Sequence, residues 1–255
     1  MKNTLKVVEK TEPAEGLIRL TSLFHEANSF SKSSKGDYLK LSLVNHDGQS
    51  VFRTFTIAGV NEEKNTLSID FVNHGGTGPA AEFVKNSKIG DSFQFRGPGI
   101  GKKLSLECEH YFLIADRSAF AAMKAQAEVL INDSRQLKIY LIFDSSLASA
   151  KQYFNSLLTD QRVEFKVVTN EYEEGRLLEE LTSYDLEKIH NKALWCAGER
   201  TSIQVVRNYL KEAPELHFQI GYISSYWQKG LKEEQYKIAK KTGLMGERLR
   251  NLVRI

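Results

Sequence analysis

The first hundred residues follow the two-residue period of short β-strands with one buried face. In Leu39–Leu43, leucine alternates with lysine and serine, which is typical of a strand whose other face is in solvent. Turn-forming stretches, such as residues 34–37 and 45–48, separate five predicted strands: Leu17–Leu23, Tyr38–Val44, Phe52–Ile57, Thr66–Val72 and Ser92–Phe95. Strands at this spacing predict a small antiparallel barrel. One helix interrupts them, from Pro79 to about Asn86, with proline in its first turn.

After residue 99 the pattern changes to continuous apolar runs that alternate with helical stretches. The predicted strands are Tyr111–Ala115, Leu137–Phe143, Val163–Val168, Ala193–Ala197 and His217–Tyr222. The predicted helices are Ser118–Ile131, one starting near Leu147, Leu177–Leu186 and Ile203–Leu210. Apolar strands that alternate with helices predict a parallel sheet covered on both faces. We therefore expect a barrel domain in residues 1–105 and an α/β domain in residues 106–255.

The composition changes this picture only by excluding other classes of protein. Hydrophobic residues make up 41% of the chain and charged residues 26%, which is ordinary for a globular protein. No run approaches the roughly eighteen apolar residues of a membrane span, and the first residues lack the apolar stretch of a secretory signal. Two cysteines, Cys108 and Cys196, are too few for a disulfide framework or a four-ligand metal site, and Cys196 is expected to be a buried, inert thiol. We expect a soluble protein of the cytoplasm, without a bound metal.

The charge is unevenly distributed along the chain. The net charge is +3, yet residues 229–255 contain eight basic and three acidic side chains. This basic, helical tail is either a solvated surface or an attraction for an anionic ligand or partner. Because it lacks interleaved aromatic residues after Tyr236, nucleic-acid binding is not expected.

Two motifs in the first half combine charge, an aromatic ring and open backbone amides. Residues 53–56, Arg-Thr-Phe-Thr, offer a guanidinium, a ring and two hydroxyls, which together suit a flat anionic ligand. Residues 74–81, His-Gly-Gly-Thr-Gly-Pro-Ala-Ala, lead into the helix at Pro79, where free amides and the helix dipole favour phosphate. Taken singly, the strand and the turn are equally consistent with a purely structural role.

The order of these motifs resembles the siderophore-interacting proteins, which are flavin-dependent ferric-siderophore reductases within the ferredoxin–NADP reductase superfamily. After the two motifs, Gly90-Asp91 and Gly97-Pro98 follow in the family's order. Three later stretches also match: residues 112–119 (FLIADRSA), 195–199 (WCAGE) and 226–230 (YWQKG). The chain departs from the family pattern with Phe55 for a tyrosine, Arg117 for an acid, Ala122 or its neighbour for a proline, and Gln228-Lys229 for two arginines.

The resemblance implies two cofactor sites. FAD would bind the barrel at Arg53, Thr54, Phe55, Thr56, Val72, His74, Thr77, Gly78, Pro79, Ala80, Ala81 and Trp227. NADH or NADPH would bind the α/β domain near Asp116, Arg117, Ser118, Ala119 and Glu199. At the end of a predicted strand, Asp144 would favour NADH through the adenosine ribose, whereas Lys151 would serve a 2′-phosphate, so the donor stays open. No side chain is named as a catalytic acid or base.

The implied substrate is an anionic ferric siderophore, for which Lys40, Lys102, Lys103 and Lys229 are the candidate ligands. The expected activity is therefore an FAD-dependent, NAD(P)H-linked reduction of ferric siderophores. One alternative is a flavin or ferredoxin-type reductase that serves a protein partner, such as a ferredoxin-like electron carrier. The other is a flavoprotein that binds ferric siderophore without using a pyridine nucleotide itself.

Overall fold

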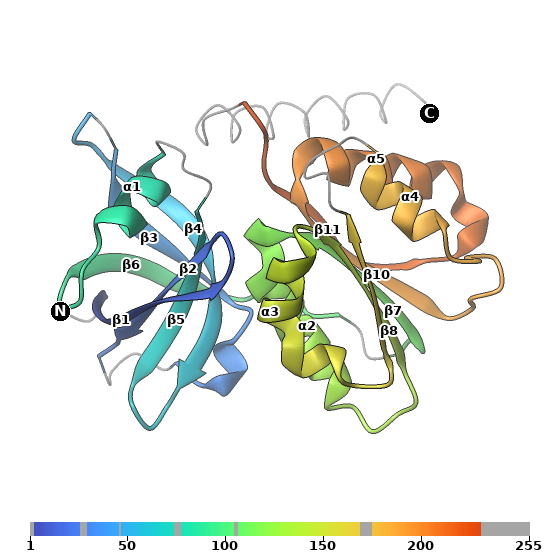
Figure 1. Ribbon diagram of the computed structural model, residues 1–255, viewed down its shortest axis with the longest axis horizontal. Helices are drawn as coiled ribbons and strands as arrows, with labels where there is room; N and C mark the ends of the chain where they lie inside the picture. The colour runs from blue at the N-terminus through green and yellow to red at the C-terminus, as the bar shows by residue number, and fades with distance from the viewer. Residues whose placement is uncertain are drawn as a thin grey trace, which may run out of the picture.

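The computed structural model describes residues 3–25, 30–45, 47–73, 78–104, 107–168 and 175–230. The chain folds into a closed six-stranded barrel followed by a five-stranded sheet with helices (Figure 1). Both features of the predicted fold class, the antiparallel barrel and the parallel sheet, are confirmed. No helix of the described residues is long and apolar enough to cross a membrane.

The barrel strands are β1 (Thr4–Ala14), β2 (Leu17–Leu23), β3 (Tyr38–Val44), β4 (Ser50–Asn61), β5 (Thr66–Val72) and β6 (Ser92–Gly99). Around the barrel their order is β1-β2-β5-β4-β3-β6, and every neighbouring pair is antiparallel. The alternating leucines of β3 all point inward and are almost completely buried, as their spacing predicts. The first strand, β1, is absent from the predicted strands because its second half is polar and its alternation is broken by two register shifts.

Short helical elements complete the barrel. The helix α1 (Pro79–Asn86) lies between β5 and β6 and has the predicted bounds. A single 3-10 turn, η1 (Lys32–Ser34), precedes β3. Where the chain leaves the barrel, the backbone N–H of Gly101 donates to Asp37 at 2.8 Å. Only glycine fits at position 101, because a Cβ there would lie 2.2 Å from the carbonyl oxygen of Gly36.

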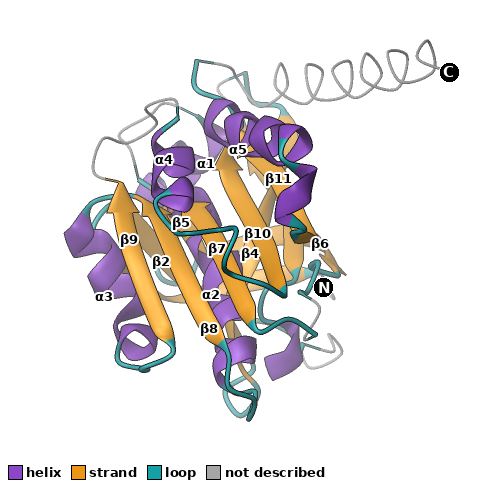
Figure 2. Cartoon of the chain, turned by 90° about the vertical axis from the view of Figure 1, so that its right-hand side faces the viewer, coloured by secondary structure: helices purple, strands orange, loops and turns teal. Residues whose placement is uncertain are grey.

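The sheet is entirely parallel, with the order β11-β10-β7-β8-β9 (Figure 2). Its strands are β7 (His110–Asp116), β8 (Lys138–Asp144), β9 (Val163–Val168), β10 (Lys192–Glu199) and β11 (Gln219–Trp227). Its helical elements are η2 (Arg117–Ala119), α2 (Phe120–Ile131), α3 (Leu147–Leu158), α4 (Arg176–Thr182), α5 (Arg200–Glu212) and η3 (Pro214–Leu216). Helices α2 and α3 lie on the face toward the barrel and α4 and α5 on the other (Figure 1). This two-sided cover explains the continuous apolar runs.

Several elements differ from their predicted bounds, among them β4, which extends to Asn61, and two elements of the second half, β11 and α4. The last strand begins at Gln219 instead of His217, because His217 adopts a left-handed conformation (φ 50°) that ends the preceding 3-10 turn. It also continues to Trp227, beyond the predicted end at Tyr222, which places that tryptophan at the carboxyl edge of the sheet. Helix α4 ends at Thr182 and not near Leu186, which nonetheless packs into the outer core.

The barrel and the sheet share an apolar core. Ala14 and Leu17 of the barrel belong to the same buried cluster as Phe120 of α2 and Phe154 of α3. A second cluster fills the barrel, and a third lies under α4 and α5. Because buried side chains pack continuously across the junction, the two halves form one body through α2 and α3.

Polar contacts reinforce this junction. Asp70 on β5 accepts two hydrogen bonds from Arg19 on β2, at 2.6 and 2.8 Å, and another from the hydroxyl of Tyr153 on α3. A separate ion pair joins Lys35 of the barrel to Glu128 of α2. Burial alone would lower the pKa of Arg19, but the hydrogen bonds and charge of Asp70 outweigh it and raise that pKa. Arg19 is therefore held in its charged form.

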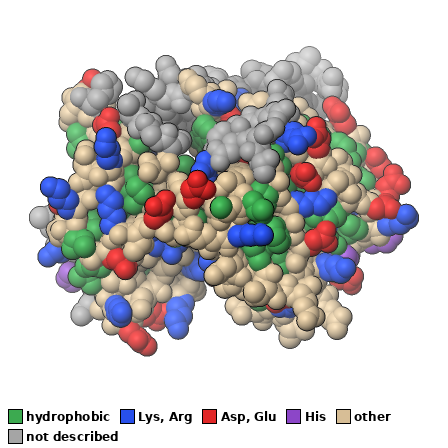
Figure 3. Space-filling view, in the orientation of Figure 1, with side chains coloured by type: hydrophobic (Ala, Val, Ile, Leu, Met, Phe, Trp, Pro, Cys, Tyr) green, Lys and Arg blue, Asp and Glu red, His purple; other side chains and the backbone are tan. Residues whose placement is uncertain are grey.

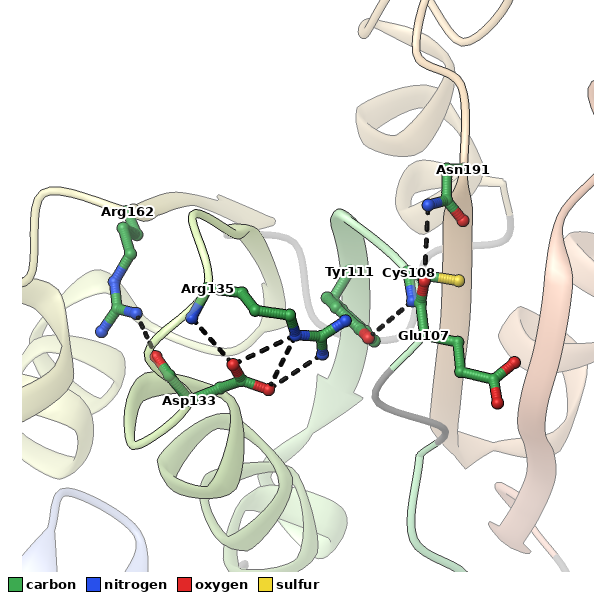
Figure 4. Close-up of polar contacts among 7 residues, drawn as sticks. All are labelled: Glu107, Cys108, Tyr111, Asp133, Arg135, Arg162 and Asn191. Atoms are coloured by element: carbon green, nitrogen blue, oxygen red, sulfur yellow. Dashed lines mark hydrogen bonds and ion pairs between the residues drawn. The ribbon is translucent and has the colours of Figure 1, made fainter.

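A polar cluster lies at the amino-terminal ends of the sheet strands, away from the carboxyl edge that Trp227 reaches (Figure 4). There Arg135 forms an ion pair with Asp133 at 2.9 Å, and the hydroxyl of Tyr111 accepts from the backbone N–H of Cys108 at 3.0 Å. Both cysteines are completely buried, as expected for Cys196, and burial raises the pKa of each thiol. The polar cluster around Asp133 and Arg135 has a structural role, since its polar groups form hydrogen bonds and ion pairs with one another.

Candidate functional site

A cavity of about 670 Å³ lies between the barrel and the carboxyl edge of the sheet. The barrel side is lined by residues of β4, β5 and α1, and the sheet side by residues that follow β7 and by the end of β11. The predicted site residues that line it are Arg53, Thr54, Phe55, Thr56, Val72, Ala80, Lys102, Arg117, Ser118 and Trp227. The fold thus brings together side chains that are up to 174 positions apart in the sequence.

Strand β4 supplies the charge and the ring on the barrel side. The side chain of Arg53 is 6% exposed and donates a hydrogen bond to the carbonyl oxygen of Phe52 at 3.2 Å. The ring of Phe55 packs on that of Phe71, with 4.5 Å between the ring centroids. A buried guanidinium beside an aromatic wall is suited to an anion that carries a flat ring.

The start of α1 supplies backbone donors. The N-cap is Gly78, which has no side chain that could cap the helix, and Pro79 occupies the first turn. The first described intrahelical bond here runs from the N–H of Glu82 to the carbonyl of Gly78, so the earlier amides of the helix need partners from elsewhere. Only Ala80 of this group lines the cavity, with Gly78, Pro79 and Ala81 beside it. His74 and Thr77, predicted for the same site, lie outside the described residues.

Arg117 and Ser118 lie at the turn from β7 into α2, and both line the cavity. The guanidinium of Arg117 reaches back to the barrel, because a Cβ on Gly16 would lie 2.4 Å from its Nη1. Ala119 is completely buried behind this turn. An arginine therefore stands at the junction where the family pattern has an acid, and it adds positive charge to the cavity.

Asp116 and Glu199, predicted for the nicotinamide side, are buried and do not line the cavity. The carboxylate of Asp116 accepts four hydrogen bonds from described residues, among them one from the indole N–H of Trp227 at 2.8 Å. Burial raises the pKa of Asp116, while the hydrogen bonds from Ser118 and Trp227 oppose that shift. Glu199 caps α5 by accepting from the amides of Thr201 and Ser202 at 2.5 and 3.1 Å.

Two further sequence features also lie away from the cavity lining. Asp144 is 2% exposed at the end of β8, so it presents little surface to a ribose. Gln228, which stands where the family has an arginine, has a buried amide oxygen that accepts no hydrogen bond from any described residue. Of the four departures from the family pattern, Phe55, Arg117 and Ala122 line the cavity.

The four candidate lysines are not equivalent. Lys102 lines the cavity, whereas Lys103 is exposed beside it. Lys229 is exposed and follows Trp227 by two residues. Lys40 lies directly opposite Thr54 of β4 in the ladder, and Thr54 lines the cavity. Opposite residues of an antiparallel pair share a face, so Lys40 points to the same side as Thr54.

The structure adds a cation that the sequence interpretation misses. Arg96 on β6 lies directly opposite Lys40 on its other side, and its guanidinium is 4.1 Å from the ring centroid of Phe52. Arg96 and Phe52 line a second pocket, of about 240 Å³, on the barrel surface. Lys40 and Arg96 share a face at adjacent positions, an arrangement of like charges that destabilises a sheet. Only the strand register brings them together, so no local sequence signal marks Arg96.

The donor set of the cavity fits FAD. Arg53 and the first amides of α1 suit a diphosphate, and Phe55 gives an aromatic face for a ring system. Trp227 and Ala80 add apolar wall, and the cavity volume lies within the usual range for ligand sites. On the face drawn in Figure 3, basic side chains lie on both halves of the molecule and are interspersed with acidic ones.

Comparison with known protein families gives two adjoining matches. Residues 44–102 match the model of the siderophore-interacting FAD-binding domain, which includes β4, β5 and α1. Residues 108–230 match the model of the siderophore-interacting protein, which includes the whole parallel sheet. Together the two models cover both sides of the cavity.

Individual relatives agree with these matches. Ferric acinetobactin reductase from Acinetobacter baumannii is 24% identical over 194 residues, which are 74% of this chain and 65% of that protein. Ferric vibriobactin reductase ViuB from Vibrio cholerae is 21% identical over 253 residues, or 91% of each chain.

Solved structures with the same fold include a siderophore-interacting protein from Acinetobacter baumannii, with a TM-score of 0.78 and 17% identity over 96% of this chain and 98% of that one. The siderophore-interacting protein SipS from Aeromonas hydrophila has a TM-score of 0.73 and 25% identity over 96% and 99% of the two chains. Ferredoxin–NADP+ reductase from Plasmodium falciparum has a TM-score of 0.63 and 14% identity over 88% and 95%. The fold is thus the ferredoxin reductase fold.

Proposed function

Because this chain belongs to the siderophore-interacting protein family, we propose that it is a cytoplasmic, FAD-dependent reductase of anionic ferric siderophores that uses NADH or NADPH. The observation that supports this most is the cavity. There Arg53, Phe55 and the start of α1 face the carboxyl edge of a parallel sheet. Open α/β sheets bind their ligands at that edge.

In this proposal the residues of the barrel hold the cofactor. Arg53 and the amides that open α1 bind the diphosphate, and Phe55 supports the ring system. FAD supplies the step between a two-electron hydride donor and the one-electron acceptor Fe(III). The protein's contribution is placement and electrostatics, so no acid or base side chain is assigned.

Positive charge around the cavity would attract the ferric chelate. Lys102 and Arg117 line the cavity, and Lys40 and Arg96 lie opposite each other on the adjoining barrel face. Neither Lys40 nor Arg96 forms an ion pair with a described carboxylate. A cluster of this kind raises the local concentration of an anionic substrate and makes its capture sensitive to salt.

We expect Arg96→Gln to raise the KM for an anionic ferric chelate by about two- to fivefold at low salt, with kcat unchanged. The difference from wild type should shrink as the ionic strength increases, because exposed charges are screened. A matched control is Arg135→Gln at the amino-terminal end of the sheet, where the arginine is also exposed. An equal rise in KM in both variants, or none in Arg96→Gln, would contradict a role for this residue in substrate capture.

The direct test of the function is an anaerobic reaction of FAD-loaded protein with NADH or NADPH and a ferric siderophore, with Fe(II) trapped by a coloured chelator. We expect Fe(II) to form at a rate that depends on the protein, the flavin and the nicotinamide donor. A protein that carries FAD but forms no Fe(II) with any reductant would exclude the reductase.

One observation favours a second candidate, a siderophore-binding flavoprotein that does not itself use a pyridine nucleotide. Asp116 and Glu199, both expected near the nicotinamide, are buried and bonded to protein donors, and Arg117 replaces an acid there. Stopped-flow mixing separates the two candidates. Loss of the oxidised-flavin absorbance with NADH or NADPH supports the first, whereas its persistence with both and its loss with a reduced electron carrier support the second.

A further inference from the structure

The carboxylate of Asp116 connects the ends of three strands. It is 1% exposed and lies at the end of β7, the central strand. One oxygen accepts from the backbone N–H and the hydroxyl of Ser118, at 2.8 and 2.5 Å. The other accepts from the backbone N–H of Glu199 and the indole N–H of Trp227, both at 2.8 Å. Four donors leave no oxygen for a ligand.

The neighbouring backbone is shaped for this carboxylate. Gly198 has a φ of +156°, and a Cβ there would lie 2.8 Å from one oxygen of Asp116. A side chain at position 198 would therefore push the carboxylate away from the edge of the sheet. Glycine in the Ala-Gly-Glu stretch thus has a role that its sequence alone does not reveal.

A second buried carboxylate holds the chain just after the tryptophan. Glu199 is 3% exposed, and its Oε1 accepts from the backbone N–H of Lys229 at 3.1 Å while its Oε2 caps α5. Trp227 and Lys229 are thus fixed on either side of Gln228. Trp227 lines the cavity together with Phe55 and Arg53.

The geometry points to Asp116 as a positioning residue that acts through Trp227, fixing the indole as the wall of the cavity opposite the barrel. This role differs from direct contact with a nicotinamide, because the carboxylate is enclosed by protein donors. It rests on the proposed function only in taking the cavity as the FAD site. Without the carboxylate, the indole N–H loses this acceptor and the ring is held less firmly at the wall.

The first readout is the accessibility of Trp227 in protein without cofactor. The only other tryptophan, Trp195, is 2% exposed. An increase in the quenching of tryptophan fluorescence by acrylamide therefore reports greater accessibility of Trp227. We expect Asp116→Ala to increase the quenching constant by about twofold or more, with Trp227→Phe giving the contribution of Trp195 alone. Ser202→Ala is the matched control, because the Ser202 hydroxyl is also buried but accepts and donates no described hydrogen bond. Unchanged quenching in Asp116→Ala would overturn the proposal.

The second readout is the dissociation constant for FAD in a double-mutant cycle. Asp116→Ala and Trp227→Phe should each weaken FAD binding by about fivefold or more, and the double variant should be no more than about twofold weaker than the worse single variant. If the double variant instead weakened FAD binding by the product of the two single effects, Asp116 would not act through Trp227.

If Asp116→Ala does not fold, Trp227→Phe alone still tests the wall, and wild-type affinity in that variant would overturn the proposal. A wild-type protein that binds no FAD would contradict the proposed function instead, while the quenching readout would still test the contact between Asp116 and Trp227.

Discussion

Replacing Arg53 with methionine is expected to weaken FAD binding by about 10- to 100-fold. Methionine keeps the length of the buried stem but removes the guanidinium of Arg53, a residue that is 6% exposed and lines the cavity. Hydrogen bonds to a charged group contribute about 1.5–3 kcal/mol, and each 1.4 kcal/mol changes a dissociation constant tenfold. The measurement is a titration of cofactor-free protein with FAD, followed by the quenching of flavin fluorescence.

Two controls make this result specific. Arg135→Met removes a guanidinium from the far end of the sheet and should leave FAD binding unchanged (Figure 4). Thermal unfolding of the cofactor-free Arg53→Met variant should remain cooperative, because methionine preserves the packing of the buried stem. If Arg53→Met bound FAD as tightly as wild type, the phosphate site would have to lie elsewhere.

Asp70→Ala should lower the free energy of unfolding by about 3 kcal/mol. The change leaves Arg19 without its carboxylate and Tyr153 without the acceptor of its hydroxyl. Removing one partner of a buried ion pair costs about 3–5 kcal/mol. The lower end applies here because the side chain of Arg19 is 28% exposed, whereas that of Asp70 is 6% exposed. Denaturant unfolding of cofactor-free protein measures the loss.

A graded series separates the two contacts of Asp70. Tyr153→Phe removes only the hydroxyl that crosses from α3 to the barrel and should cost about 1 kcal/mol. Glu179→Ala breaks an exposed pair with Arg176 and should change stability by less than about 0.5 kcal/mol. A loss in Asp70→Ala no larger than that in Glu179→Ala would show that the junction does not depend on this carboxylate.

Local patterning predicts most of the fold because the buried faces are regular. The alternating leucines of β3 and the unbroken apolar run of β7 each identify a strand and the kind of sheet that holds it. The exception is β1, in which Leu5 and Val7 are buried but the following charged residues and register shifts interrupt the period. Its position is determined by pairing with β2, which follows it directly, and with β6, which is distant in the sequence.

The residues of the candidate site are likewise predicted where they belong to a continuous local motif and missed where only long-range pairing brings them together. Arg53, Phe55 and Ala80 are found from the sequence because their motifs are continuous stretches of one strand or one helix start, and the structure places all three around the cavity. Arg96 is missed because it meets Lys40 only through the strand register. Burial also separates residues that a motif places together, since Ser118 lines the cavity whereas Asp116, two residues earlier, is buried and does not line it.

The central claim is that FAD lies between β4 and the carboxyl edge of the sheet, and a crystal structure of the protein grown with FAD tests it most directly. We predict electron density for the ring system beside Phe55 and for the diphosphate between Arg53 and the first amides of α1. Density for FAD at another place, or a protein that crystallises from excess FAD with side chains filling this cavity, would contradict the claim.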